Sequence, residues 1–160
     1  MDTGNPVIDA QSAFARERRR RRRHEAASWL LRRRDQSHLV SLDCALGGAA
    51  PARRSAVGLT TIPLDSIVGT AESAKERAFD GSFRPPSTSR DRWQRLWMAS
   101  RSGRSLPPIS VFKVGDRHYV EDGHHRVSVA HSLGMAAIDA EVTELGKATK
   151  AFGPKVGAFA

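Results

Sequence analysis

The sequence is poor in several features that would point to particular classes of protein. It has one cysteine, Cys44, so no disulfide can form within the chain. No stretch approaches the roughly 20 apolar residues that a helix needs to cross a bilayer. The longest apolar stretch near the N-terminus, at residues 28–31, is short and flanked by arginine, which does not suit a secretory signal. We therefore expect a cytoplasmic protein without a transmembrane segment.

Lysine is absent from the first 60 residues, where 12 arginines face 6 acidic residues. Residues 61–160 hold 14 lysines and arginines against 11 acids, so two thirds of the net charge of +9 lies in the N-terminal part. Residues 8–34 consist mostly of good helix formers, which predicts a basic helical extension. Its centre is an unbroken run of six arginines: Arg18, Arg19, Arg20, Arg21, Arg22 and Arg23.

Six adjacent guanidinium groups cover every face of a helix and repel one another, so we expect this run to order only on a polyanion. Two interpretations stay open. The run is a solvated, frayed helix without a specific partner, or it is an arm that binds the phosphates of DNA or RNA, or an acidic membrane surface. Binding of the second kind weakens steeply with salt and reads no base sequence.

The rest of the chain predicts a small α+β domain with a mixed sheet and flanking helices. Residues 35–58 show little periodicity and are interpreted as a linker. A first strand at residues 60–62 is followed by an irregular stretch over 69–86, a helix that begins near Ser87 and ends at Gly103, a hairpin of strands 109–114 and 117–120, a helix over 124–133 and a strand over 137–142. The expected units are therefore the extension and linker (1–58), the domain (59–145) and a flexible tail (146–160).

Two tryptophans, Trp93 and Trp97, recur at helical spacing with Leu96. They could stack on bases, but this spacing favours a place in the core. No helix-turn-helix pair follows the domain, and no internal repeat is visible.

The most informative segment is Asp122-Gly123-His124-His125-Arg126. It reads as the end of a strand, a turn and the start of a helix. A helix start presents unpaired N–H groups and the positive end of the helix dipole, and both favour anions. Gly123 permits a close approach of the backbone, His124 and His125 can donate hydrogen bonds, and Arg126 can hold two phosphate oxygens. The segment therefore predicts a phosphate site.

This segment, together with the preceding Leu106-Pro107-Pro108-Ile109-Ser110-Val111 and the later Ile138-Asp139-Ala140-Glu141-Val142, resembles the ParB/sulfiredoxin superfamily over residues 59–145. The resemblance implies that Gly123 to Arg126 hold the phosphate of CTP, ATP, ADP or an adduct. His124 stands where sulfiredoxins carry their reactive cysteine, so repair of sulfinic acid by that route is not expected. ParB partition proteins carry Gly-Glu-Arg-Arg at this turn and DNA-binding helices after it, and this chain has neither.

The turn is also similar to that of the free-serine kinases of the superfamily, which carry Asp-Gly-His-His-Arg. That resemblance implies a glutamate base after the first strand, and Glu72 is in about the right place, with Asp65 and Glu76 nearby. Asp122 could hold Mg²⁺ beside ATP, ADP or CTP, or it could simply cap the following helix. We expect no zinc, because adjacent histidines diverge on a helix and no second Cys/His cluster exists.

Three functions follow, in order of preference. The first is a ParB-like protein that binds the phosphate of a nucleotide or nucleic acid at residues 122–126 and associates with DNA or RNA through its arginines. The second is a kinase that transfers a phosphoryl group from ATP or ADP to a small hydroxyl substrate such as an amino acid. The third is a nuclease. It is the weakest of the three, because the sequence shows no carboxylate cluster fit to hold two metals.

Overall fold

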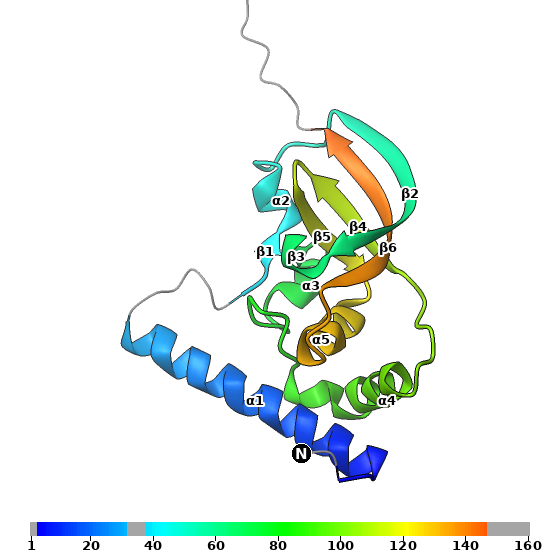
Figure 1. The fold of residues 1–160 in the computed structure, drawn as a ribbon. Helices are drawn as coiled ribbons and strands as arrows, with labels where there is room; N and C mark the ends of the chain where they lie inside the picture. The colour runs from blue at the N-terminus through cyan, green and yellow to red at the C-terminus, as the bar shows by residue number, and fades with distance from the viewer. Residues whose placement is uncertain (1–2, 32–37, 147–160) are drawn as a thin grey trace, which may run out of the picture.

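A mixed six-stranded sheet forms the centre of the structure, with the strand order β1-β3-β5-β4-β6-β2 (Figure 1). The computed structural model describes residues 3–31 and 38–146. The strands are β1 (Val40–Ser41), β2 (Arg53–Pro63), β3 (Ile67–Thr70), β4 (Ile109–Val114), β5 (Arg117–Asp122) and β6 (Ala137–Gly146). β1, β3 and β5 run parallel, as do β4 and β6, whereas the β4–β5 hairpin and the β2–β6 pair are antiparallel. The predicted α+β class with a mixed sheet and flanking helices is confirmed.

Three helices form successive layers on one face of this sheet. They are α5 (His124–Ser132), α4 (Arg90–Arg101) and α1 (Pro6–Leu30), and Figure 1 shows α5 between the sheet and α4, with α1 lying across α4 on the outside. Two shorter helices, α2 (Leu42–Ala45) and α3 (Ser73–Glu76), and 3₁₀ turns at Leu64–Ser66 and Ser87–Ser89 complete the elements. No helix among the described residues is both long and apolar enough to cross a membrane.

Buried side chains hold these layers together. The core under α5 includes Val111 and Val120 of the sheet and Val127 of the helix, all at most 2% exposed. The outer core joins α1, α4 and α5, and Trp93 at its centre is 0% exposed, with Trp97 at 5%. Trp93 also donates its indole N–H to the hydroxyl of Ser128 on α5 over 2.9 Å. The prediction that both tryptophans belong to the core is confirmed.

The linker prediction for residues 35–58 is wrong for the described part of that range. β1, α2 and the first half of β2 lie within it, and β2 pairs with β6 from Arg53 onward, with a bulge between Ala56 and Gly58. A pattern of alternating apolar residues does not reveal these elements, because β1 has two residues and β2 is an edge strand whose side chains are mostly exposed. The irregular stretch predicted from Gly69 likewise contains the end of β3, which is held between β1 and β5.

The arginine run is part of a formed helix, which differs from the expectation that it orders only on a polyanion. Phe14 packs edge-on against Trp93, with ring centroids 5.5 Å apart, and anchors the helix upstream of the run. Arg18 and Arg21 donate to the backbone carbonyls of Pro85 and Ala78, over 3.1 and 2.7 Å. Ion pairs of Glu17 with Arg20 and of Glu25 with Arg21 further reduce the repulsion within the run. Arg32 to Arg34 and the tail from residue 147 lie outside the described residues.

Candidate functional site

The turn at the start of α5 has the backbone that the sequence predicts. β5 ends at Asp122, Gly123 takes a left-handed conformation with φ +108°, and α5 begins at His124. A Cβ atom on Gly123 would lie 2.5 Å from Cγ2 of Ile109, so the close approach requires glycine. No side chain caps α5, which leaves the N–H groups of its first turn available to a ligand.

The sheet topology brings two further segments to this turn. β3 runs parallel to β5, so the residues after its end at Thr70 lie beside the end of β5. β4 is antiparallel to β5, and its start therefore lies next to Asp122, through the pairing of Ser110 with Asp122. The segment after β3 and the Pro107–Pro108 segment thus flank the start of α5 on opposite sides.

A cavity of about 210 Å³, here called the α5 hollow, opens in front of this turn. Lys75 of α3 and Arg92 of α4 reach it from outside the turn. Glu72 lies at the N-cap of α3 and also lines it. The complete lining is Glu72, Lys75, Arg92, Leu96, Asp122, Gly123, His124, His125 and Arg126. Every site residue predicted outside the arginine run therefore lies around one hollow.

Arg126 has partners that the sequence did not reveal. Its Nη1 donates to the carbonyl oxygens of Pro107, over 2.7 Å, and Pro108, and its Nη2 donates to Oδ2 of Asp122 in an ion pair. The side chain is only 13% exposed. The guanidinium group therefore ties the end of β5 to the start of β4. No acceptor among the described residues meets its Nε, which lies beside Gly123.

Asp122 does not cap α5, which was one of its two predicted roles. Gly123 occupies the N-cap position, and the Asp122 carboxylate reaches forward to Arg126 instead. The Asp122 side chain is 67% exposed, so its second oxygen remains accessible to a cation. Within the described residues no group of three or more His, Cys, Asp and Glu side chains could hold a metal ion.

The two histidines occupy different environments. His124 is 3% exposed, and its Nε2 lies 2.8 Å from the hydroxyl of Thr70, which also accepts from the amide of Glu72 over 2.9 Å. His125 is half-buried, and its Nε2 is enclosed without a hydrogen-bond partner among the described residues. Both rings pack against Phe79, at centroid distances of 5.8 and 5.1 Å. His124 thus fixes the turn, whereas the Nε2 of His125 is enclosed and unpaired among the described residues.

Burial makes both imidazoles neutral at pH 7. Burial first, and then Lys75 and His125, lower the pKa of His124 to about 4. Burial first, and then Arg92 and Lys75, lower the pKa of His125 to about 4. Neither ring therefore adds a positive charge to the hollow at pH 7.

These pKa values predict acid instability. In the unfolded chain the histidines bind protons near their ordinary pKa of 6.5, whereas His124 and His125 stay neutral in the fold until about pH 4. The unfolded state therefore binds more protons over this range, and the free energy of unfolding falls as the pH drops from about 6.5 to about 4. Burial lowers the pKa of His118 and His131 as well, with the same sign.

We expect a loss of up to about 3 kcal/mol for each of these two histidines across this interval, at about 1.4 kcal/mol per pKa unit, measured by urea unfolding at a series of pH values. Titration of the ring protons by NMR provides the direct check. Values near 6.5 for His124 and His125 would contradict the expectation.

A third histidine, His118, lies buried on β5. It is 6% exposed, and its Nδ1 lies 2.9 Å from the hydroxyl of Ser66. Its position on β5 faces the 3₁₀ turn that precedes β3, and this turn covers it. His131 is half-buried and stacks on Phe83, as a structural role requires.

The residues that the sequence analysis missed are Thr70, Lys75 and Arg92. Thr70 joins His124 to Glu72 through its hydroxyl group. Lys75 and Arg92 carry no local signal, because only the tertiary structure brings α3 and α4 to the start of α5.

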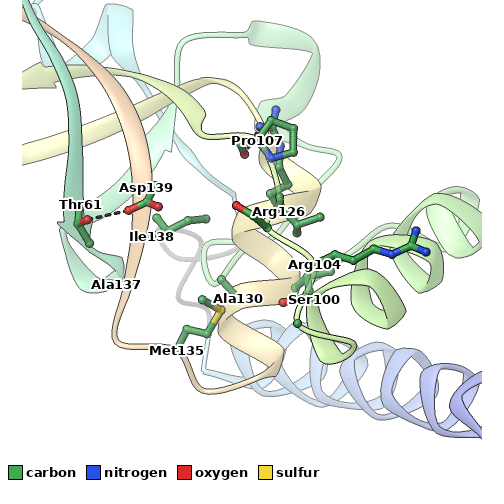
Figure 2. A pocket seen from close by; sticks show the side chains of 14 residues that line it. Thr61, Ser100, Arg104, Pro107, Arg126, Ala130, Met135, Ala137, Ile138 and Asp139 are labelled. Atoms are coloured by element: carbon green, nitrogen blue, oxygen red, sulfur yellow. Dashed lines mark hydrogen bonds between the residues drawn. The ribbon is translucent and has the colours of Figure 1, made fainter.

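A second, larger cavity of about 350 Å³ lies on the other side of Arg126. Figure 2 shows Ile138 and Asp139 of β6 on one side of it, and Ala130 and Arg126 of α5 on the other. The Asp139 carboxylate already accepts the Thr61 hydroxyl over 2.7 Å, and Arg104 extends away from the cavity. Of the two arginines that line this cavity, Arg126 is tied to Pro107, Pro108 and Asp122, and Arg104 extends away from it, so the α5 hollow with Lys75 and Arg92 is the better candidate site for an anion.

Comparison with known proteins gives a likeness of fold. The mixed sheet with its flanking helices is an α+β fold. Among solved structures, the chain is similar to the crystal structure of sulfiredoxin from Arabidopsis thaliana, at 20% sequence identity and a TM-score of 0.40. The match covers 52% of this chain and 82% of that chain. No protein-family model and no curated protein matches the sequence.

Proposed function

We propose that the α5 hollow binds the phosphate group of a nucleotide or of a nucleic acid. The observation that supports this most strongly is the meeting of Lys75 and Arg92 with the uncapped first turn of α5. Two side-chain cations, backbone N–H groups and the helix dipole then act on one anion. His125 also lines the hollow.

The second part of the proposal is that the arginines of α1 add affinity for DNA or RNA, as in a ParB-like nucleic-acid-associated protein. Arg18 and Arg21 are engaged with backbone carbonyls, so the contribution comes from the others. Arg19, Arg22 and Arg23 are exposed and meet no carboxylate among the described residues. Their contacts with phosphate would provide affinity without base readout.

The hollow is tested with the full-length protein against tripolyphosphate, ADP, ATP and CTP, each with and without Mg²⁺. Tripolyphosphate isolates the anion from the base. We expect Lys75→Ala and Arg92→Ala each to weaken its binding about 10-fold, since each removes one charge-assisted contact of about 1.4 kcal/mol. Thermal shift and isothermal titration calorimetry measure the effect.

Arg95→Ala is the matched control, because Arg95 is exposed on α4 but lies outside the hollow. Its loss should leave tripolyphosphate binding unchanged. If none of the four anions stabilises the wild-type protein, the proposal for the hollow is wrong. If Arg95→Ala weakens binding as much as Arg92→Ala does, the anion responds to overall charge and not to this hollow.

A second candidate function, phosphoryl transfer to a small hydroxyl substrate, is favoured by the position of Glu72. Its exposed carboxylate lines the same hollow as Asp122. Asp122 could hold Mg²⁺ through its free oxygen together with the phosphates, a mode typical of this ion. Glu72 would then be the base that activates the hydroxyl. Glu72→Gln should abolish transfer from ATP or ADP while nucleotide binding persists, and absence of transfer by the wild-type protein leaves binding alone as the function.

A further inference from the structure

The outer face of α1 carries both exposed cations and an exposed aromatic ring. The inner face of this helix packs Ala10, Ala13 and Phe14 against α4. At about 100° per residue, Arg22 and Trp29, which are seven residues apart, lie on the same side of the helix and away from this inner face, with Arg19 and Arg23 beside them. α1 is therefore a fixed helix with one side bound to the domain and the other open.

Trp29 is unlike the other two tryptophans of the chain. Its side chain is 81% exposed, whereas Trp93 is 0% and Trp97 is 5% exposed. It lies six and seven residues beyond Arg23 and Arg22, which is about 10 Å along the helix axis. At about 3.4 Å per stacked nucleotide, this distance corresponds to about three nucleotides.

We propose that the outer face of α1 binds single-stranded nucleic acid, with arginines 19, 22 and 23 on the phosphates and an unpaired base stacked on Trp29. This inference rests on the nucleic-acid part of the proposed function and makes it specific. In a duplex, neighbouring base pairs cover both faces of each base, so only an unpaired base can stack on an exposed indole ring. Alternation of arginine contacts with an aromatic platform is the usual chemistry of single-strand binding.

The distribution of apolar residues disfavours the alternative partner, an acidic membrane. A helix that lies in a bilayer interface needs an apolar face along its length. The apolar face of α1 is already used against α4, and the exposed Trp29, Leu30 and Leu31 gather at the C-terminal end. Between the exposed Ile8 and Trp29, the exposed residues of α1 are glutamine, serine, arginine, glutamate and alanine, so no apolar face runs along its open side.

The fluorescence of Trp29 provides a direct test, because the other two tryptophans are buried. The full-length protein is titrated at low salt with an oligothymidylate single strand and with a duplex of equal length. We expect the single strand to quench the fluorescence without a blue shift, and Trp29→Ala to weaken its binding about 10-fold. Binding of the duplex should not change in this variant.

Two variants complete the design. Leu30→Ala is the matched control, since Leu30 is 75% exposed at the same end of the helix but cannot stack, and it should leave binding unchanged. Replacing arginines 19, 22 and 23 together by alanine should reduce the slope of log K against log salt by about 2 for single strands. Trp29→Phe should retain most of the affinity.

The outcomes separate this inference from the function on which it rests. Equal affinity for single strand and duplex, with no effect of Trp29→Ala, overturns the stacking inference while nucleic-acid binding by the arm remains. Binding of neither nucleic acid overturns both. A blue shift on phosphatidylglycerol vesicles without quenching by the oligonucleotide assigns the face to a membrane and also overturns the inference.

Discussion

Replacing Gly123 with alanine is expected to lower the free energy of unfolding by about 3 kcal/mol and to abolish measurable binding of tripolyphosphate. Two costs add. The residue has φ +108°, which L side chains rarely adopt, and its Cβ would lie 2.5 Å from Cγ2 and 2.9 Å from Cβ of Ile109. Ile109 is 0% exposed and pairs with Ala140 in the centre of the sheet, so it has little room to move.

Gly134 supplies the control, because it follows the C-terminal end of the same helix. Its φ is +67°, and an added Cβ would meet nothing within 4 Å. Gly134→Ala therefore isolates the conformational cost, about 1 kcal/mol, from the collision. Urea unfolding of the two variants measures the difference. An equal effect of the two substitutions would show that Ile109 accommodates the methyl group and that the close approach does not restrict position 123.

The turn at Gly123 could be predicted because its causes are local. A strand end, a glycine and a helix start follow one another within six residues. The same helix ends at Gly134, which has a left-handed backbone, and the Met135 amide there donates to the Ala130 carbonyl. The β4–β5 hairpin has a comparably local cause in the tight turn at Gly115. The spacing of Trp93 and Trp97 likewise sufficed to assign them to the core.

The other half of the site depends on contacts between distant segments. β3 has four residues and exists as a strand because β1 and β5 pair with it on either side. The end of β3 then places Thr70 next to His124, and α3, which follows it, places Lys75 in the wall of the hollow. The pattern of apolar residues within a window of 18 or fewer residues cannot reveal these contacts between distant segments. The sequence therefore predicts the phosphate turn but not the cations that complete it.

The α1 helix also depends on contacts between distant segments. Charge repulsion alone predicts a disordered arginine run, and the run is nevertheless helical because of its surroundings. Phe14 docks upstream, and Arg21 reaches a carbonyl 57 residues away. Neither partner is visible in the local sequence, so composition gives the charge of the arm but not its attachment.

Arg126→Ala is expected to reduce both stability and anion binding. Besides facing the hollow, the guanidinium group holds the carbonyls of Pro107 and Pro108 and the carboxylate of Asp122. Loss of these contacts should cost about 2 kcal/mol of unfolding free energy, because they are charge-assisted and partly buried. Tripolyphosphate affinity should fall at least about 10-fold, since the Nε–H beside Gly123 is lost as well.

Arg126→Lys distinguishes the charge from the geometry. A lysine keeps the positive charge but lacks the planar fork that reaches three partners at once. If the role of Arg126 is to hold the turn, this variant should resemble Arg126→Ala in both stability and affinity. If only the charge matters, it should resemble the wild-type protein, and the inference that Arg126 fixes the β5–β4 junction is then wrong.

Asp122→Asn tests the same ion pair from its other partner. It removes a negative charge from the hollow and releases one guanidinium donor, so affinity for tripolyphosphate without Mg²⁺ should rise about 3-fold. With Mg²⁺ present the gain should disappear, because the amide is a poorer ligand for the ion than the carboxylate. A fall in affinity without Mg²⁺ would mean that the Arg126–Asp122 pair must stay closed for the hollow to bind an anion, and phosphate would then contact Lys75 and Arg92 alone.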